Sequence, residues 1–528
     1  MTDPRAAGAA VDPRRGETGP VTRFDVLVTA AEAYPALERE FLAAENTISA
    51  SFRVFDLSTR LRSDAARKIG EDWFDLLVHT LRRGVRVRMV LSDFDPIGAD
   101  DLHRLCWRAR RWFAAAAELA GEGGLEVISD CHPAEAGAGA RLVLAPGAFG
   151  RLRGVIGKLN ALPEAKRARY LSEAPGLAAL VRPGRDGVAP RAALPRLFPA
   201  THHQKMAVFD ERRLYIGGLD LNERRYDTPG HRRAPHSTWH DLQAMVEGPV
   251  VAAATAHLEG FLDAVAGRRA PPPPAPGFLR TLSRRARRAP FRFSPVPMVR
   301  ELERAHFARI AEARQLIYME TQFFRHLPLA RALARRARAC PDLCLILLVP
   351  AAPEDVAFED NRGLDARYGE HLQQRCLDVI RDGFGQRRML VVSPVQSRPH
   401  PGDGRETLEA APLVYVHSKL SIFDDRAAIL SSANLNGRSL CWDSEAGLEL
   451  TEPDQLAHLR RRAMGHWLPD PVEDAALAPA TAFGRWVALA ERNARAAPSE
   501  RQGFLVPYDS QPAREIALPA PGVPDAMV

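Results

Sequence analysis

The first half of the chain alternates between strand-like and helix-like patterns of apolar residues. Residues 46–56 have the composition of a strand, and residues 71–83 place apolar side chains at helical spacing. Gly84 ends the helical pattern, and residues 85–96 again have the pattern of a strand. The predicted order is therefore strand, helix, strand.

The second half of the chain repeats this order. Residues 314–324 are β-rich, residues 328–339 follow a helical pattern, and residues 343–350 form an apolar strand candidate. Strands that alternate with helices predict an α/β fold, in which helices cover both faces of a sheet.

A segment rich in proline and arginine separates the two halves. The chain divides into a tail (1–22), an N-terminal half (23–266), a linker (267–297), a C-terminal half (298–509) and a second tail (510–528). The linker contains four consecutive prolines and eight arginines, and it has no acidic residue. We interpret it as a solvated connector, with a patch for anionic lipid headgroups as the alternative.

The N-terminal half is the longer one. Ile48 and His203 are 155 residues apart, whereas the corresponding Ile317 and His417 are 100 apart, a difference of 55. The extra residues are expected at about 150–200, just before the first motif described below. Such an insertion could be a lid, a membrane contact or an elaboration without a role.

Composition limits the class of protein. The 528 residues exceed what one hydrophobic core holds, and 46% hydrophobic with 26% charged residues is ordinary for a globular protein. The net charge of +7 favours anionic partners, although arginine-rich composition makes this a weak signal. The chain has no long apolar run and no signal-peptide core. A cytoplasmic or peripheral membrane protein is expected, with secretion by a non-classical route as an alternative.

One stretch of the sequence occurs twice. Residues 202–225, HHQKMAVFDERRLYIGGLDLNERR, align without a gap with residues 416–439, VHSKLSIFDDRAAILSSANLNGRS. At a constant offset of 214, the matched pairs are His203 with His417, Lys205 with Lys419, Asp210 with Asp424, Asp220 with Asn434, Asn222 with Asn436, and Arg224 with Arg438. Chance does not explain six polar matches at one offset.

The repeated residues suit phosphate chemistry. Residues two apart on a strand share a face, so each histidine and its lysine point the same way. Gly218 and Ser432 belong to small-residue turns, where backbone amides can approach an anion closely. Two imidazoles and two ammonium groups that converge could clamp and attack a phosphodiester.

The repeated motif resembles the two H-x-K-x4-D signatures of the phospholipase D superfamily. Residues 317–324, IYMETQFF, resemble another element of these enzymes, with Thr321 where asparagine is usual. The second copy has Ser431 at a glycine position. The resemblance and the duplication predict two similar α/β/α sandwich halves with mixed sheets, related by a pseudo-two-fold axis. One active site is expected at their interface.

The resemblance implies roles for the matched residues. The predicted catalytic signature comprises His203, Lys205, Asp210, His417, Lys419 and Asp424, and the predicted phosphate-binding residues are Asp220, Asn434, Gly218 and Ser432. His203 is expected to be the nucleophile and His417 the general acid. Asp210 and Asp424 begin turns and lie an odd number of residues from the lysines, so we expect them to be structural members of the signature.

A nucleophilic imidazole needs a hydrogen-bonding partner on its second nitrogen. The family places an acidic residue for this purpose on the strand after each motif. Matching the apolar faces of those strands assigns the role to Asp241 and Glu445, with Asp443 as the alternative in the second copy. In the competing interpretation, Asp241 and Glu445 are solvated surface carboxylates.

The resemblance implies hydrolysis of a glycerophospholipid to phosphatidic acid and a headgroup alcohol. It implies no metal and no other cofactor, and no cluster of metal ligands is evident in the sequence. The expected partners are a phospholipid at a membrane surface and water or an alcohol as acceptor; a monomer that binds no nucleic acid is expected. The alternatives are phosphatidyl transfer as in cardiolipin synthesis, a nuclease of the same superfamily, and a non-catalytic scaffold.

Overall fold

The computed structural model describes residues 19–121, 123–286, 289–292, 294–520 and 523–527. Most of the predicted N-terminal tail therefore lies outside the described residues.

In the N-terminal sheet the strands lie in the order β1 (Arg23–Val28), β9 (Leu242–Glu247), β8 (Arg213–Gly217), β7 (Met206–Phe209), β2 (Thr47–Phe52), β3 (Arg86–Asp93) and β4 (Leu125–Cys131). Strands β2, β3 and β4 are parallel and the other pairs are antiparallel, so the sheet is mixed.

The C-terminal sheet repeats this order. Its strands are β11 (Val296–Arg300), β10 (Phe278–Arg284), β19 (Glu445–Leu450), β18 (Ala427–Ser431), β17 (Leu420–Phe423), β12 (Leu316–Glu320), β13 (Cys344–Leu348), β14 (Met389–Pro394) and β20 (Leu505–Pro507). The run from β10 to β14 matches the run from β1 to β4 strand by strand, and β11 and β20 are additions at the two edges. The duplication in sequence is therefore a duplication of fold.

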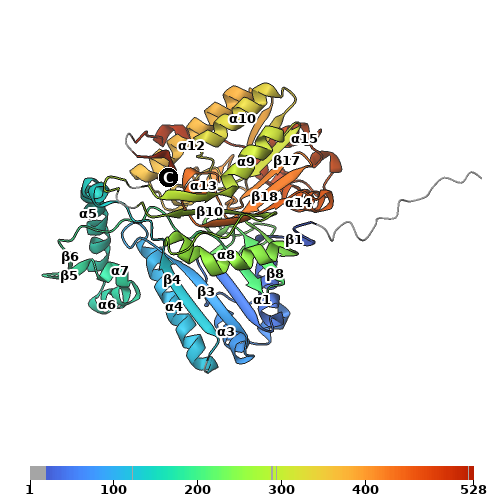
Figure 1. The fold of residues 1–528 in the computed structure, drawn as a ribbon. Coiled ribbons are helices and arrows are strands. Elements are labelled where there is room, and N and C mark those ends of the chain that lie inside the picture. Colours follow the sequence, from blue (N-terminus) through green and yellow to red (C-terminus); the bar gives the residue numbers. More distant parts are fainter. Residues whose placement is uncertain (1–18, 122, 287–288, 293, 521–522, 528) are drawn as a thin grey trace, which may run out of the picture.

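Helices cover the outer face of each sheet (Figure 1). The N-terminal sheet is covered by α1 (Thr29–Ala43), α3 (Trp73–Arg82) and α4 (Asp100–Ala120), and the C-terminal sheet by α9 (Glu301–Glu312), α10 (Leu327–Ala339) and α12 (Leu364–Phe384). Side chains two residues apart on a strand point to the same face of the sheet. Ile48, Ala50 and Phe52 of β2 therefore all pack in the core beneath α1, α3 and α4.

A shared core joins the two halves. It contains the inner faces of both sheets and three further helices, α8 (Val250–Val265), α14 (Pro453–His466) and α15 (Ala482–Arg495). Helix α8 of the N-terminal half contacts β10, and α14 of the C-terminal half contacts β1. Backbone hydrogen bonds are also reciprocal, since His203 N donates to Ser444 O at 2.9 Å and His417 N donates to His240 O at 2.8 Å.

The insertion begins earlier than the sequence predicts. It contains α5 (Ala138–Asn160), α6 (Glu164–Glu173), α7 (Pro175–Ala178) and the hairpin β5 (Val181–Gly184) with β6 (Gly187–Pro190), which project to one side of the two sheets (Figure 1). Leu152, Ile156 and Leu177 give it a small core of its own. Arg151 pairs with Asp365 of the C-terminal half at 3.1 Å.

Two segments expected to be loose are structured. The predicted linker contains all of β10, and Arg280 in that strand is buried against Glu301, with an Nη2–Oε1 distance of 2.7 Å. The described part of the predicted C-terminal tail contains α16 (Gln511–Ile516), and Tyr368 Oη donates to Asp525 Oδ1 at 2.8 Å. Apolar burial and charge pairing order both segments, which composition alone marked as polar connectors.

The remaining short elements lie in connections between the sheets' strands. They are α2 (Asp64–Arg67), α11 (Glu354–Phe358), α13 (Gly437–Cys441), and the two-residue strands β15 (Thr407–Leu408) and β16 (Ala411–Pro412). Within the described residues, we find no helix whose length and apolarity would let it cross a membrane.

Candidate active site

Both histidines of the repeated motif line one cavity at the interface of the halves. His203 and Lys205 lie immediately before β7, and His417 and Lys419 occupy the same position before β17. The cavity has a volume of about 660 Å³, and its lining includes His203, His417 and Asn434. The two motifs, 214 residues apart in sequence, therefore form one site.

Each histidine forms a hydrogen bond with a carboxyl group of the opposite half. His203 Nδ1 lies 2.9 Å from Glu445 Oε1, and His417 Nδ1 lies 2.6 Å from Asp241 Oδ2. Both carboxylates are fully buried, which contradicts the interpretation as solvated surface groups. Asp443, the alternative to Glu445, instead pairs with Arg438 at 3.1 Å. The sequence indicated the two carboxylates, and the structure adds that they are exchanged between the halves.

Burial favours the neutral form of both imidazoles. Burial lowers the pKa of His203 and of His417 well below the usual range, and the adjacent lysine of each motif lowers it further. Because Nδ1 of each ring contacts a carboxylate, Nε2 is the nitrogen left for chemistry in the cavity.

The two lysines are buried beside their histidines. Lys205 Nζ donates to the carbonyl oxygen of His203 at 2.6 Å, and Lys419 Nζ donates to that of His417. Burial lowers the pKa of both ammonium groups, and that of Lys419 falls to about 7, while Asp241 opposes the shift. The residue spacing correctly predicted that each lysine lies on the side of its histidine.

Five arginines that the sequence did not single out for binding also line the cavity: Arg53, Arg151, Arg225, Arg325 and Arg438. The guanidinium of Arg225 stacks on Trp239 at 3.6 Å, and Trp239 in turn packs on His417 with 4.6 Å between ring centroids. Arg438 belongs to the repeat and could have been found there. Arg53 and Arg225 carry no local signal, since only the packing of the halves brings them here.

Only one of the four predicted phosphate-binding residues faces the cavity. Asn434 lines it, and its buried Oδ1 has no hydrogen-bond partner among the described residues. Asp220, its counterpart, accepts a hydrogen bond from Val54 N at 2.9 Å and lies 3.9 Å from Arg53 Nη1. Asp220 therefore supports Arg53, and its contact with phosphate stays a prediction.

The expected approach of a phosphate to the backbone amides of Gly218 and Ser432 is wrong. Their backbone amides donate to Leu242 O at 3.2 Å and Ala446 O at 3.0 Å, and are therefore not offered to a phosphate. A Cβ atom on Gly218 would lie only 2.2 Å from Asp241 Oδ1, while Ser432 Oγ donates to Glu445. Both small residues accommodate or hold the carboxylates that orient the histidines.

The motif aspartates lie away from the cavity, as structural members. Asp210 accepts hydrogen bonds from the backbone amides of residues 45, 46 and 47, each at 2.8 Å. Asp424 accepts three equivalent bonds from residues 314, 315 and 316. Each aspartate has a positive φ in its turn and ties that turn to the start of β2 or β12.

Comparisons with known proteins give relatives of low sequence identity. No family model matches the chain. Among curated proteins, phospholipase D alpha 1 of Zea mays is 24% identical over 381 residues, covering 49% of this chain and 46% of the maize protein. The enzyme of the same name from Carica papaya is 24% identical over 372 residues. This chain is therefore similar in sequence to phospholipases D. It matches about half the length of these curated relatives.

Solved structures of superfamily members are more distant in sequence. A phosphatidylserine synthase of Haemophilus influenzae Rd KW20 is 11% identical, covers 84% of this chain and 85% of its own, and has a TM-score of 0.48. A polyphosphate kinase of Porphyromonas gingivalis is 12% identical, covers 84% and 46%, and has a TM-score of 0.41. The likeness to phospholipases D therefore rests on the curated relatives.

The structural role of the motif aspartates can be measured. Asp424→Asn keeps a side chain that tolerates positive φ but directs an amide NH2 at backbone N–H donors. We expect a loss of about 1–3 kcal/mol in the free energy of unfolding, measured by denaturant titration. The exposed neighbour Asp425→Asn is the control and should change stability little. Equal stability of the two variants would contradict the anchoring role.

Proposed function

We propose that this protein cleaves the headgroup ester of glycerophospholipids, as a phosphodiesterase of the phospholipase D type. The observation that carries the proposal is one cavity lined by two neutral, buried histidines, each oriented by a carboxylate of the opposite half. Two buried lysines beside these histidines supply positive charge for an anionic substrate.

In the first step, Nε2 of His203 attacks phosphorus and forms a P–N bond. The P–O bond to the headgroup breaks, and His417 delivers a proton to the departing oxygen. The anionic phosphodiester favours the protonated form of His417 when substrate is bound, which offsets the effect of burial. Glu445 stabilises the charge that develops on the His203 ring.

In the second step, water attacks the phosphohistidine. His417, now neutral, takes a proton from that water, the P–N bond breaks, and phosphatidic acid leaves with His203 restored. Lys205, Lys419 and the amide of Asn434 are the groups proposed to hold the non-bridging oxygens in both steps. An alcohol in place of water would give phosphatidyl transfer through the same intermediate.

The assay uses vesicles of phosphatidylcholine and phosphatidylglycerol, with plasmid DNA cleavage measured in parallel. We expect release of choline or glycerol together with phosphatidic acid, and no release by His203→Ala. A product that is only a new phospholipid, formed when an alcohol is added, would favour a transferase. Plasmid cleavage without headgroup release would assign the site to a nuclease, and no turnover of either substrate would contradict the proposal.

The exchanged carboxylates should have separable effects. Glu445→Gln should slow formation of the phosphohistidine, whereas Asp241→Asn should spare it when the leaving group is p-nitrophenol, which departs without a proton. We expect each variant to lower turnover of a natural phospholipid by about 10²- to 10⁴-fold. Rapid quenching with labelled substrate measures the intermediate directly.

Glu449→Gln is the matched control, since Glu449 lies on the same strand as Glu445 and pairs with Arg309 at 2.8 Å outside the cavity. It should leave both steps unchanged. Accumulation of phosphohistidine in Glu445→Gln but not in Asp241→Asn would reverse the assigned roles of the two histidines.

Lys419 should give the reaction an alkaline limit. Its pKa is lowered to about 7 by burial, so its charge is lost as pH rises through that value. We expect kcat/KM to fall above pH of about 7, because the neutral amine no longer stabilises phosphate oxygens. A bound phosphodiester is anionic and favours the charged form of Lys419. The fall in kcat should therefore occur at a higher pH than the fall in kcat/KM. A kcat/KM that is constant above this pH would contradict the assignment.

A further inference from the structure

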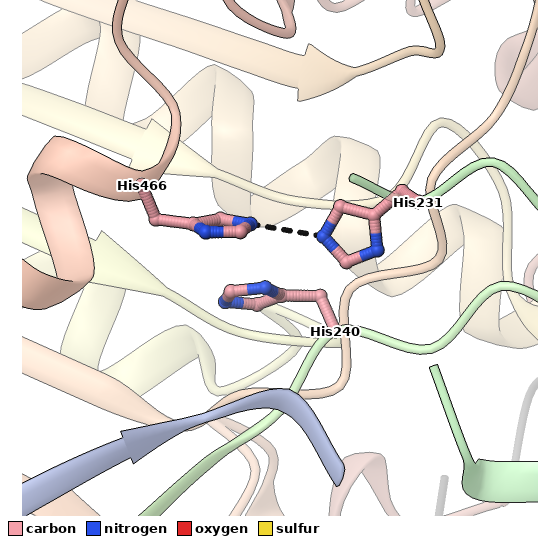
Figure 2. A group of neighbouring side chains, drawn as sticks. All are labelled: His231, His240 and His466. Carbon is pink, nitrogen blue, oxygen red and sulfur yellow. Dashed lines mark hydrogen bonds between the residues drawn. The ribbon is translucent and has the colours of Figure 1, made fainter. Parts of the chain in front are cut away.

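Three histidines meet in a cluster outside the catalytic cavity, and no pattern in the sequence indicates it. His231 and His240 come from the connection between β8 and β9, and His466 from the end of α14 in the opposite half. One ring nitrogen of each lies within 4.8 Å of the others, and the three rings face one another (Figure 2). None of the three lines the catalytic cavity.

The surroundings of the cluster are largely apolar. His231 and His240 are fully buried, and His466 is half-buried. The ring of Trp467 packs on His240 with 4.2 Å between centroids, and Phe504 stacks on His466 at 5.7 Å. Imidazoles in such surroundings need polar partners, because an unpaired buried polar group costs about 1–3 kcal/mol.

His231 is oriented toward the centre of the cluster. Its Nδ1 lies 2.8 Å from Oδ2 of the buried Asp227, and its Nε2 lies 2.9 Å from Nε2 of His466. A carboxylate on one ring nitrogen fixes the proton there and leaves the lone pair of the other nitrogen for a ligand. This carboxylate–histidine arrangement is typical of metal sites.

The ring of His240 lacks a hydrogen-bond partner among the described residues. Neither of its ring nitrogens has a hydrogen bond, although the side chain is fully buried. Nε2 lies 3.6 Å from Oε2 of Glu320, beyond hydrogen-bonding distance. A buried imidazole with two unused nitrogens, next to two others, indicates a ligand that the protein atoms do not supply.

We propose that His231, His240 and His466 bind one divalent transition-metal ion, with Zn²⁺ as the expected species. Imidazole nitrogens are preferred ligands of zinc, at about 2.0–2.1 Å, which places tetrahedral ligands about 3.4 Å apart. The distances between ring nitrogens of the three histidines extend from 2.9 Å, for Nε2 of His231 and Nε2 of His466, up to 4.8 Å, and this range includes the tetrahedral value. The Glu320 carboxylate, whose Oε2 lies 3.6 Å from Nε2 of His240, is the candidate for a fourth ligand.

The ion has a positioning role. It joins the connection before β9 to α14, and so ties the N-terminal half to the C-terminal half. The carbonyl oxygen of His240 accepts a hydrogen bond from His417 N at 2.8 Å, and the next residue, Asp241, orients the His417 ring. Metal at His240 therefore fixes the backbone that holds one catalytic histidine. This inference stands on the cluster and does not depend on the proposed substrate.

The test uses the whole chain produced without a histidine tag. The protein is stripped with a chelator, then titrated with Zn²⁺ and, separately, with Co²⁺. We expect about one ion per chain by elemental analysis, a cobalt absorption spectrum of tetrahedral type, and a higher melting temperature with zinc, since an ion that binds only the folded state stabilises it.

His466→Gln is the informative variant, because the residue is half-buried and its loss least threatens folding. His458→Gln, on the same helix and 43% exposed at its side chain, is the matched control. We expect His466→Gln to weaken zinc binding at least about a hundredfold and to lose the stabilisation by zinc, with unchanged circular dichroism. His458→Gln should behave as the wild type.

Three results would overturn the proposal. One is a wild-type chain that binds neither zinc nor cobalt near one equivalent. Another is equal binding by His466→Gln and His458→Gln, which would place the ion elsewhere. The third is bound zinc that leaves the melting temperature of the wild type unchanged. Because each readout is independent of phospholipid turnover, failure of the proposed function would leave this test intact.

Discussion

The exchange of carboxylates between the halves is the constraint on which the site depends. Glu445 orients His203 and Asp241 orients His417, so each motif lacks the partner of its own histidine until the halves pack together. The same contact surface excludes water from both pairs, and burial keeps the imidazoles neutral. The site is therefore complete only when the two halves are packed together.

Burying this many ionisable groups requires a well-packed interface. Two lysines and two carboxylates lie within the same buried region, and such charges are tolerated only where opposite charges and hydrogen bonds compensate for lost solvation. The reciprocal backbone bonds of His203 and His417 hold both motifs in register. The proposed metal at His240 would add a further link at the back of the same interface.

The two copies have diverged where their roles differ. Asn434 faces the cavity with an unpaired oxygen, whereas Asp220 is used to hold Arg53. Gly218 leaves room for the Asp241 carboxylate, whereas Ser432 donates to that of Glu445. A nearly symmetric pair of histidines thus lies in two different environments, which suits a nucleophile and a general acid.

The sequence alone determined the strand–helix order, the duplication, and which histidines, lysines and carboxylates form the site, because these are carried by local periodicity and by a gapless repeat. Its assignment of the Gly218 and Ser432 amides to phosphate binding was wrong, since a small residue in a turn does not reveal which neighbour it will meet. Only the tertiary structure decided which carboxylate serves which histidine, brought Arg53 to the cavity, and joined His466 to His231 and His240. These contacts arise between residues that are distant in the chain, where packing of the halves sets the geometry and no local pattern records it.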